Sequence, residues 1–198
     1  MTKEILIIFT RYPEAGKTKT RMIPALGAEG AANLQRKMTE QTLLKVQQLP
    51  QLIEVHFAGG NLQLMQQWLG DNIIYQPQNQ GDLGIKMQTA FARAFAAKMS
   101  KVVIIGIDCP ELNSAILIEA FTALNHHDLV LGPAADGGYY LIGLTTLIPE
   151  LFIGINWGTS QVLAQTKTLA ENLNLKVNYL PILNDVDRPE DFKFVISL

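Results

Sequence analysis

Short runs of apolar residues recur along the chain and are separated by longer stretches with helical character. Five of these runs are rich in isoleucine, valine and leucine, which is typical of strands buried in a sheet. They are Ile5–Phe9, Ile53–Ala58, Val102–Ile107, Leu129–Leu131 and Val177–Leu180, and Tyr139–Leu144 is a further candidate. Val102–Ile107 is apolar at every position except Gly106, which predicts a central strand covered on both faces.

Four stretches between these runs carry few helix breakers and are predicted to be helical. They are residues 29–49, 83–98, 114–124 and 159–173. In the first, Leu34, Met38 and Leu44 indicate an apolar stripe, and in the second Ile85 and Phe91 do the same. Strands that alternate with helices predict an α/β sandwich with a mainly parallel sheet, and we expect a single domain over residues 1–198.

Composition and charge narrow the classes of function. Of 198 residues, 48% are apolar and 17% are charged, which is typical of a globular protein. Sixteen basic and eighteen acidic residues give a net charge of −2, so we expect neither a nucleic acid nor a membrane as partner. Cys109 is the single cysteine, and no secretory signal or membrane span is evident, which favours the cytoplasm. The sequence leaves the oligomeric state open, including a homodimer.

Positive charge is nevertheless concentrated directly after the first predicted strand. The cations there are Arg11, Lys17, Lys19 and Arg21. Gly16-Lys17-Thr18 resembles the end of a Walker A loop, but Arg11 stands where that motif needs glycine, and Pro13 removes an amide donor. Lysine and arginine can hold phosphate through their own charge, so we favour a small anion here over a solvated surface loop.

Aspartates follow three later strands, at the edge where open α/β sheets bind ligands. Asp108 comes after the central strand and suits Mg²⁺ or Mn²⁺, although it could instead cap the next helix. Asp136 precedes Gly137 and Gly138; it could act on an acceptor hydroxyl or bond its own backbone in a tight hairpin. Near the end of the chain, Asp185 and Asp187 lie in a loop from which they could reach a metal.

Two further residues are candidates for binding a substrate. Asp82, in Gly81-Asp82-Leu83-Gly84, is also a candidate N-cap for the helix that follows. Trp157 could stack on a ring, but a packed aromatic is the simpler interpretation. Thr159 or Ser160 could cap the helix after it.

Several long motifs in order resemble a known family. They are P-E-A-G-K-T-K-T-R, G-D-L-G-I-K-M, G-I-D-C-P-E-L, G-P-A-A-D-G-G-Y-Y-L-I-G-L, W-G-T-S-Q-V-L-A-Q-T and D-V-D-R-P-E-D-F. The pattern is similar to small bacterial glycosyltransferase-like proteins of the nucleotide-diphospho-sugar transferase superfamily, of the arsenosugar-biosynthesis or radical-SAM/selenodomain-associated type. More distantly it resembles phospholactate guanylyltransferase and the molybdenum-cofactor nucleotidyltransferase. The resemblance implies a Rossmann-like three-layer α/β/α sandwich of the glycosyltransferase-A type.

The resemblance also implies roles for individual residues. Lys17, Lys19 and Arg21 would face the phosphates of an activated nucleotide, and Asp108 and Asp187 would hold Mg²⁺ or Mn²⁺. Asp136 and its glycines would border the acceptor pocket. This sequence has Lys86 where an arginine is expected, and it lacks the D-x-D metal motif at Gly106–Pro110.

These implications lead to a metal-dependent transferase as the predicted function. Its substrates would be a nucleotide-activated small-molecule donor and a small acceptor, and a nucleotide-sugar-dependent glycosyltransferase is the first interpretation. A nucleotidyltransferase that releases pyrophosphate is the second, because one aspartate after the central strand plus a distant second is more typical of that class. A non-catalytic nucleotide-binding protein is the third.

Overall fold

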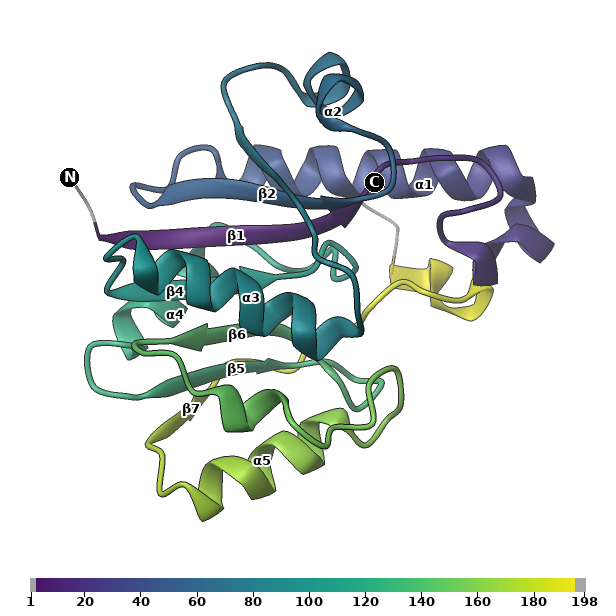
Figure 1. Ribbon diagram of the computed structural model, residues 1–198. Helices are drawn as coiled ribbons and strands as arrows, with labels where there is room; N and C mark the ends of the chain where they lie inside the picture. The colour runs from purple at the N-terminus through teal and green to yellow at the C-terminus, as the bar shows by residue number, and fades with distance from the viewer. Residues whose placement is uncertain (1–2, 195–198) are drawn as a thin grey trace.

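A computed structural model describes residues 3–194 and contains a seven-stranded sheet between layers of helices (Figure 1). The strands are β1 (Glu4–Arg11), β2 (Leu52–Ala58), β3 (Ile74–Pro77), β4 (Lys101–Ile105), β5 (Leu129–Pro133), β6 (Tyr139–Leu144) and β7 (Val177–Tyr179). Their order across the sheet is β3-β2-β1-β4-β6-β5-β7. The six predicted strands are all present, and the α/β class is confirmed.

The sheet is mainly parallel, with one strand reversed. β1 runs parallel to β2 and β4, β2 runs parallel to β3, and β5 runs parallel to β7. β6 is antiparallel to both of its neighbours, β4 and β5. Its direction follows from the connection, because the short turn at residues 134–138 can join β5 and β6 only as a hairpin.

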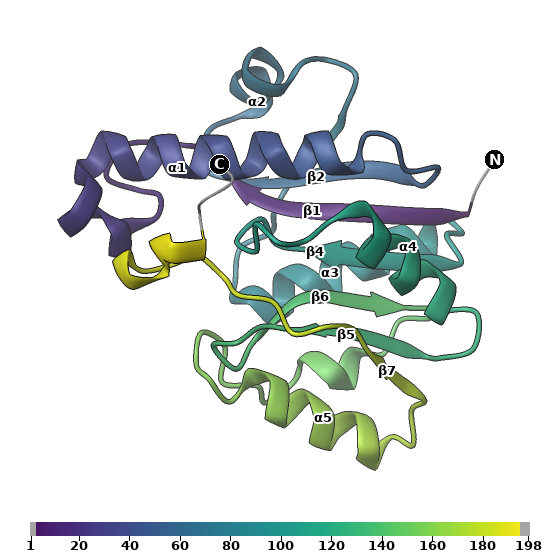
Figure 2. The same cartoon turned by 180° about the vertical axis from the view of Figure 1, so that it is seen from behind.

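Helices cover both faces of the sheet and make three layers. They are α1 (Ile23–Val46), α2 (Leu62–Leu69), α3 (Leu83–Ala96), α4 (Ser114–Ala123) and α5 (Val162–Asn172), with short 3-10 helices η1 (Thr20–Met22), η2 (Pro149–Phe152) and η3 (Pro189–Phe194). α3 and α5 lie on the face seen in Figure 1, and α1 and α4 lie on the face seen in Figure 2. Each face has its own apolar cluster, with Met38 and Leu117 in one and Phe91 and Ala170 in the other.

β4 lies at the centre of the sheet and is buried on both faces, as its unbroken apolar run predicts. Val103 and Ile105 pack toward α1 and α4, whereas Val102 and Ile104 pack toward α3 and α5. The strand ends at Ile105, two residues earlier than predicted. Gly106 and the residues after it therefore leave the sheet at its carboxyl edge.

The structure corrects several expectations. β3 and α2 were not predicted, because a strand of four residues and a helix of eight leave only a weak periodic signal. Leu44 is 62% exposed and Ile85 is 48% exposed, so neither belongs to the apolar face to which it was assigned. α5 begins at Val162, and neither Thr159 nor Ser160 is its N-cap; Gln161 occupies that position.

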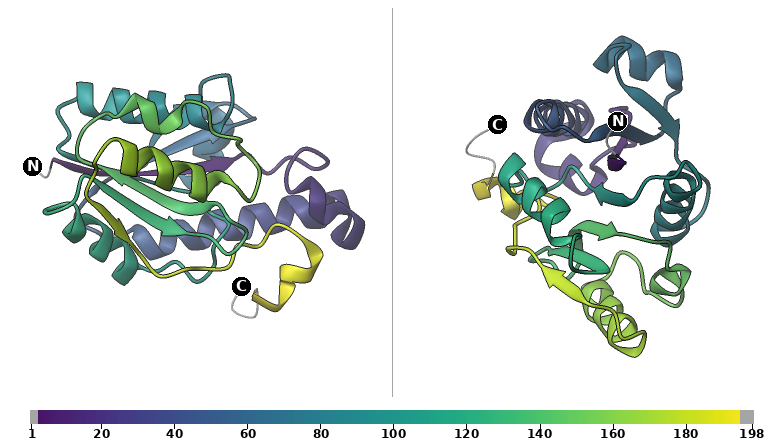
Figure 3. Two further views of the ribbon diagram at one scale, coloured as in Figure 1. Left: turned by 90° about the horizontal axis from the view of Figure 1, so that it is seen from below. Right: turned by 90° about the vertical axis from the view of Figure 1, so that its left-hand side faces the viewer.

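Segments that are far apart in the sequence meet at the carboxyl edge of the sheet. The start of α1 and the yellow segment that ends in η3 lie at the same end of the molecule (Figure 3). A backbone bond from the Val186 N–H to the Asp108 carbonyl, 2.7 Å long, joins the late segment to the end of β4. Within residues 3–194, no helix has both the length and the apolar character needed to span a bilayer.

Candidate active site

A cleft of about 720 Å³ opens at the carboxyl edge of the sheet. Its walls come from the ends of β1, β2 and β4, the start of β6, the first turn of α3 and the loops that surround them. This is the edge at which open α/β sheets bind ligands. Every residue predicted for the site lines the cleft except Asp82 and Gly137.

The basic loop after β1 is folded and carries one exposed lysine. The Thr18 hydroxyl is buried and donates to the Glu14 carbonyl at 2.9 Å, and the Lys17 N–H donates to the same carbonyl at 3.0 Å. The Lys17 ammonium lies 2.6 Å from the Glu14 carboxylate, and both side chains are well exposed. Such a surface pair contributes little to stability, so Lys17 can turn from Glu14 to a ligand at small cost.

The other two cations of this loop pair with aspartates from elsewhere in the chain. The Lys19 side chain is only 4% exposed; its ammonium lies 2.8 Å from Asp108 Oδ1 and donates to the Val186 carbonyl at 2.5 Å. Arg21 pairs with Asp187 Oδ2. Ion pairs therefore join the basic loop, which contains Lys19 and Arg21, to Asp108 at the end of β4 and to Asp187 in the acidic loop near the end of the chain. Lys19 and Arg21 face these carboxylates, which the sequence did not predict.

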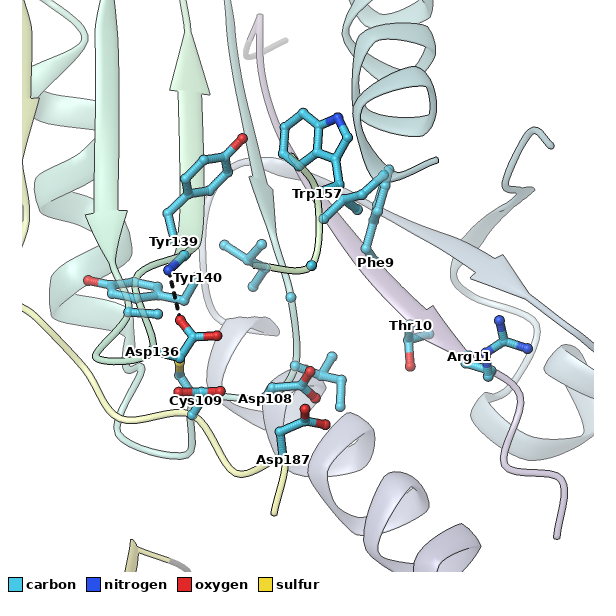
Figure 4. Close-up of a pocket in the computed structure, with 18 of the residues that line it drawn as sticks. Phe9, Thr10, Arg11, Asp108, Cys109, Asp136, Tyr139, Tyr140, Trp157 and Asp187 are labelled. Carbon is cyan, nitrogen blue, oxygen red and sulfur yellow. Dashed lines mark hydrogen bonds between the residues drawn. The ribbon is translucent and has the colours of Figure 1, made fainter. Parts of the chain in front are cut away.

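Four aspartates line the cleft, and three of them are labelled in Figure 4: Asp108, Asp136 and Asp187. Asp108 is half exposed, and it does not cap the next helix, because the Asn113 side chain caps α4 by accepting from the Ile116 N–H. Asp185 is the fourth; burial and the nearby negative charge of Asp136 raise the pKa of its carboxyl.

Asp136 is held in the hairpin between β5 and β6. Its Oδ1 accepts from the Gly138 N–H at 2.8 Å, so the expected bond to its own backbone is present. The remaining oxygen, Oδ2, is not used in that bond. Gly137 has φ +90°, and a Cβ there would lie 2.2 Å from the Ser160 carbonyl oxygen. Gly137 therefore serves the close approach of the hairpin to residue 160 and does not itself line the cleft.

A buried polar network forms part of the cleft wall and was missed in the sequence. Gln35 on α1 donates to the Thr10 hydroxyl and to the Arg11 carbonyl, and the Thr10 and Thr39 hydroxyls lie 2.8 Å apart. Gln78, after β3, donates to the His56 carbonyl at 2.9 Å and more weakly to the Thr10 carbonyl. These residues come from distant elements, and no local motif marks them.

Aromatic and apolar side chains line the wall next to α3. Tyr139 and Trp157 pack edge to face with ring centres 6.4 Å apart, and Phe9, also labelled in Figure 4, packs against the same apolar cluster. α3 closely approaches this wall, because a Cβ on Gly84 would lie 2.5 Å from Trp157 Nε1. Asp82 is the N-cap of α3, where its side chain accepts from the Ile85 N–H at 2.9 Å. Asp82 is therefore a helix cap, which was one of the two roles predicted for it.

Residues 41–159 match the model of a protein family described as "Uncharacterized protein conserved in bacteria (DUF2064)". The chain belongs to this family. The matched range contains Asp108, Asp136 and Trp157, whereas the basic loop and Asp187 lie outside it. No curated protein matches the sequence significantly.

Solved structures resemble this DUF2064 protein along its whole length. A protein from Desulfovibrio desulfuricans G20, described as a "putative nucleotide-diphospho-sugar transferase", is 33% identical with a TM-score of 0.95, over 100% of this chain and 87% of that one. The 4-diphosphocytidyl-2C-methyl-D-erythritol synthase of Anaerococcus prevotii DSM 20548 has a TM-score of 0.63 at 12% identity, over 97% and 94% of the two chains. Rv0371c of Mycobacterium tuberculosis H37Rv, in complex with manganese, has a TM-score of 0.59 at 14% identity, over 100% of both chains. These likenesses confirm the nucleotide-diphospho-sugar transferase fold.

The aspartates that line the cleft of the DUF2064 protein can contribute ligands to a metal site. Across residues 3–194, no group of three or more His, Cys, Asp or Glu side chains is arranged to hold a metal. Lys19 contacts only Oδ1 of Asp108, and Arg21 contacts only Oδ2 of Asp187, so each carboxylate keeps one oxygen without a described partner. Mg²⁺ typically binds through one or two carboxylates together with substrate phosphates, and this donor set fits that mode.

Proposed function

We propose that this protein is a transferase that uses a nucleotide-activated donor, and that the donor is a nucleotide sugar. The observation that carries the proposal is the meeting of the basic loop and the aspartates of two other segments in one cleft at the strand ends. The likeness to the Desulfovibrio protein, at 33% identity over the whole chain, supports the same class.

In this proposal, Lys17 and Arg11 hold the phosphates of the donor. Both side chains line the cleft, Lys17 has only an exposed partner, and arginine can bind two phosphate oxygens at once. Asp108 and Asp187 would hold Mg²⁺ or Mn²⁺, which when bound offsets charge on the phosphates. Lys19 and Arg21 orient these two carboxylates, since each cation holds one oxygen and leaves the other without a described partner.

We assign the acceptor side of the reaction to Asp136. The Gly138 N–H fixes its Oδ1, and Oδ2 is available to accept the proton of an acceptor hydroxyl. The hairpin positions this carboxylate rigidly, because residue 160 packs directly on Gly137. Positioning and charge complementarity would supply most of the rate enhancement, as in other phosphate-handling sites.

Nucleotidyl transfer is the second candidate, and one feature of the site favours it. Asp108 is the only acidic residue in Gly106–Pro110, and the second carboxylate comes from Asp187, far along the chain. The D-x-D motif of many glycosyltransferases is thus absent at the end of the central strand, Gly106–Pro110.

Product analysis separates the two candidates. With a nucleotide sugar and an acceptor, glycosyl transfer releases a nucleoside diphosphate, whereas nucleotidyl transfer consumes a nucleoside triphosphate and releases pyrophosphate. We expect nucleoside diphosphate release that requires Mg²⁺ or Mn²⁺ and falls at least a hundred-fold in Lys17→Ala. Pyrophosphate release would move the assignment to nucleotidyl transfer, and turnover by neither route across donor and acceptor panels would contradict the proposal.

A further inference from the structure

Two cations that line the cleft are not neutralised by any described carboxylate. Lys17, Lys19 and Arg21 each pair with an acid. Arg11 and Lys86 also line the cleft, but among the described residues their side chains have no hydrogen bond or ion pair. Arg11 is already assigned to the donor phosphates, so Lys86 is a half-buried cation that the proposed function does not use.

The position of Lys86 on α3 is unfavourable for the helix alone. Lys86 lies near the N-terminal end of α3, where the helix dipole is positive and a cation is disfavoured. The first turn contains no acidic residue, and the Asp82 cap uses its Oδ1 to accept from the Ile85 N–H. Lys86 lies three positions after Leu83 and so on the same face of the helix, and both line the cleft together with Met87. Asp82 lies four positions before Lys86, but among the described residues no ion pair joins the two side chains, so an anion in the cleft could pair with the Lys86 ammonium.

The surroundings of Lys86 differ from those of the aspartates. Leu83, Met87, Tyr139 and Trp157 give this wall an apolar and aromatic character. The contact between Gly84 and the Trp157 ring fixes the helix against the wall. One cation beside apolar side chains suits a ligand with an uncharged body and one acidic group.

We propose that Lys86 binds an acidic group, a carboxylate or a phosphate, on the second substrate of the transferase. The inference rests on the proposed function, in which Lys17, Arg11 and the aspartates hold the donor. The cleft volume of about 720 Å³ lies in the upper half of the range of about 300 to 1,000 Å³ found for small-molecule sites, which leaves room for a second substrate. Lys86 thereby restricts the acceptors to acidic molecules.

Trp157 provides a readout that needs no knowledge of the substrate. In a Trp68→Phe parent it is the only tryptophan, since the chain has two. Inorganic phosphate and malonate are titrated separately, without divalent metal, while Trp157 fluorescence is followed. The same titrations are made in Lys86→Gln and in Arg93→Gln. Arg93 is the matched control, because it is an exposed cation two turns further along the same helix and does not line the cleft.

We expect phosphate, malonate or both to change Trp157 fluorescence in the parent. The affinity for the anion should fall about tenfold or more in Lys86→Gln and be unchanged in Arg93→Gln. The probe that binds more tightly identifies the acidic group as phosphate or carboxylate. No change in the parent, or equal affinities in the parent and Lys86→Gln, would overturn the proposal. Loss of nucleotide-dependent thermal stabilisation in Lys86→Gln would place Lys86 in the donor site and overturn it as well. If no nucleotide stabilises the parent, the proposed function fails, whereas the anion titration still decides whether Lys86 binds an anion.

Discussion

The two lysines of the basic loop have different environments although they are only two residues apart. Lys17 is exposed and pairs with an exposed glutamate, whereas Lys19 is buried and contacts both Asp108 and the Val186 carbonyl. Nothing in the sequence Lys17-Thr18-Lys19 distinguishes them. The two partners of Lys19 lie about 90 and 170 positions further along the chain, whereas the partner of Lys17 is the nearby Glu14. Only the fold therefore distinguishes the lysine that is available to a ligand from the one that is bound to the acidic loop.

This difference predicts unequal effects of matched substitutions on stability. Lys19→Met removes both contacts of a buried ammonium, and we expect a loss of about 2 kcal/mol of unfolding free energy, or several degrees in Tm. Lys17→Met removes only an exposed ion pair, and we expect Tm to stay within about 1 °C. Thermal unfolding followed by circular dichroism measures both. Equal shifts in the two variants would contradict the assignment of Lys19 to the acidic loop.

At the scale of elements, a glycine in α3 sets the distance between the helix and the aromatic wall. Alanine normally favours a helix over glycine by about 1 kcal/mol. At Gly84, however, a Cβ would lie 2.5 Å from Trp157 Nε1, so we expect Gly84→Ala to destabilise the protein by about 1 to 3 kcal/mol and to shift Trp157 fluorescence.

Gly106 is the control for this substitution. An added Cβ there meets nothing within 4 Å, and its φ is not in the left-handed region. Urea unfolding of Gly84→Ala and Gly106→Ala measures their free energies of unfolding, and the emission of Trp157 is recorded in the Trp68→Phe parent. A Gly84→Ala variant at least as stable as wild type, with unchanged Trp157 fluorescence, would show that α3 does not pack closely against the Trp157 ring at Gly84.

The amino ends of β1 and β4 are joined by an ion pair whose strength depends on pH. Glu4 Oε1 lies 2.8 Å from the Lys101 ammonium, and Glu4 Oε2 accepts from the Gln51 side chain. Burial opposes ionisation of the Glu4 carboxyl, but the hydrogen bonds from Lys101 and Gln51 outweigh this effect and lower its pKa below 4.5. The folded state therefore binds this proton less tightly than the unfolded state. The resulting stabilisation is present above pH 4.5 and is lost as the pH falls through the folded pKa.

We expect Glu4→Gln to lower the free energy of unfolding by up to about 1 kcal/mol at pH 7, with the difference from wild type shrinking as the pH falls below 4.5. Urea unfolding over this pH range measures the difference. Glu29→Gln, an exposed carboxylate on α1, serves as the control and should show neither effect. A difference for Glu4→Gln that is independent of pH would mean that charge on Glu4 does not stabilise the pairing.

The elements themselves could be predicted where their apolar pattern is strong. The unbroken run of β4 was recognised as a central strand, and it is buried on both faces. β3 ends in Pro77 and has four residues, and its burial pattern includes only one buried residue, so its signal was too weak. The exposure of Leu44 and Ile85 shows the same limit, because periodicity indicates a helix more reliably than it fixes which face is buried.

At the scale of the whole molecule, the rule that ligands bind at the carboxyl edge of an open sheet predicted most of the site. The rule places the site at the residues that follow the strands, and nearly all of the predicted site residues line one cleft. The rule could not predict the contributions of Gln35 and Lys86, which lie on helices, because their place in the cleft depends on how α1 and α3 pack on the sheet. It also could not predict that Lys19 and Arg21 pair with Asp108 and Asp187.

The central claim is that this cleft binds a nucleotide through the basic loop and, with a metal, through Asp108. The most direct test is a thermal-shift panel of nucleoside triphosphates, nucleoside diphosphates and nucleotide sugars, each with and without Mn²⁺, on wild type and Asp108→Asn. A ligand that binds only the folded protein raises Tm by mass action. We predict that at least one nucleotide sugar raises Tm by several degrees only with Mn²⁺, and that Asp108→Asn, although folded, loses this rise. A wild-type protein that no nucleotide stabilises, with or without Mn²⁺, would contradict the claim.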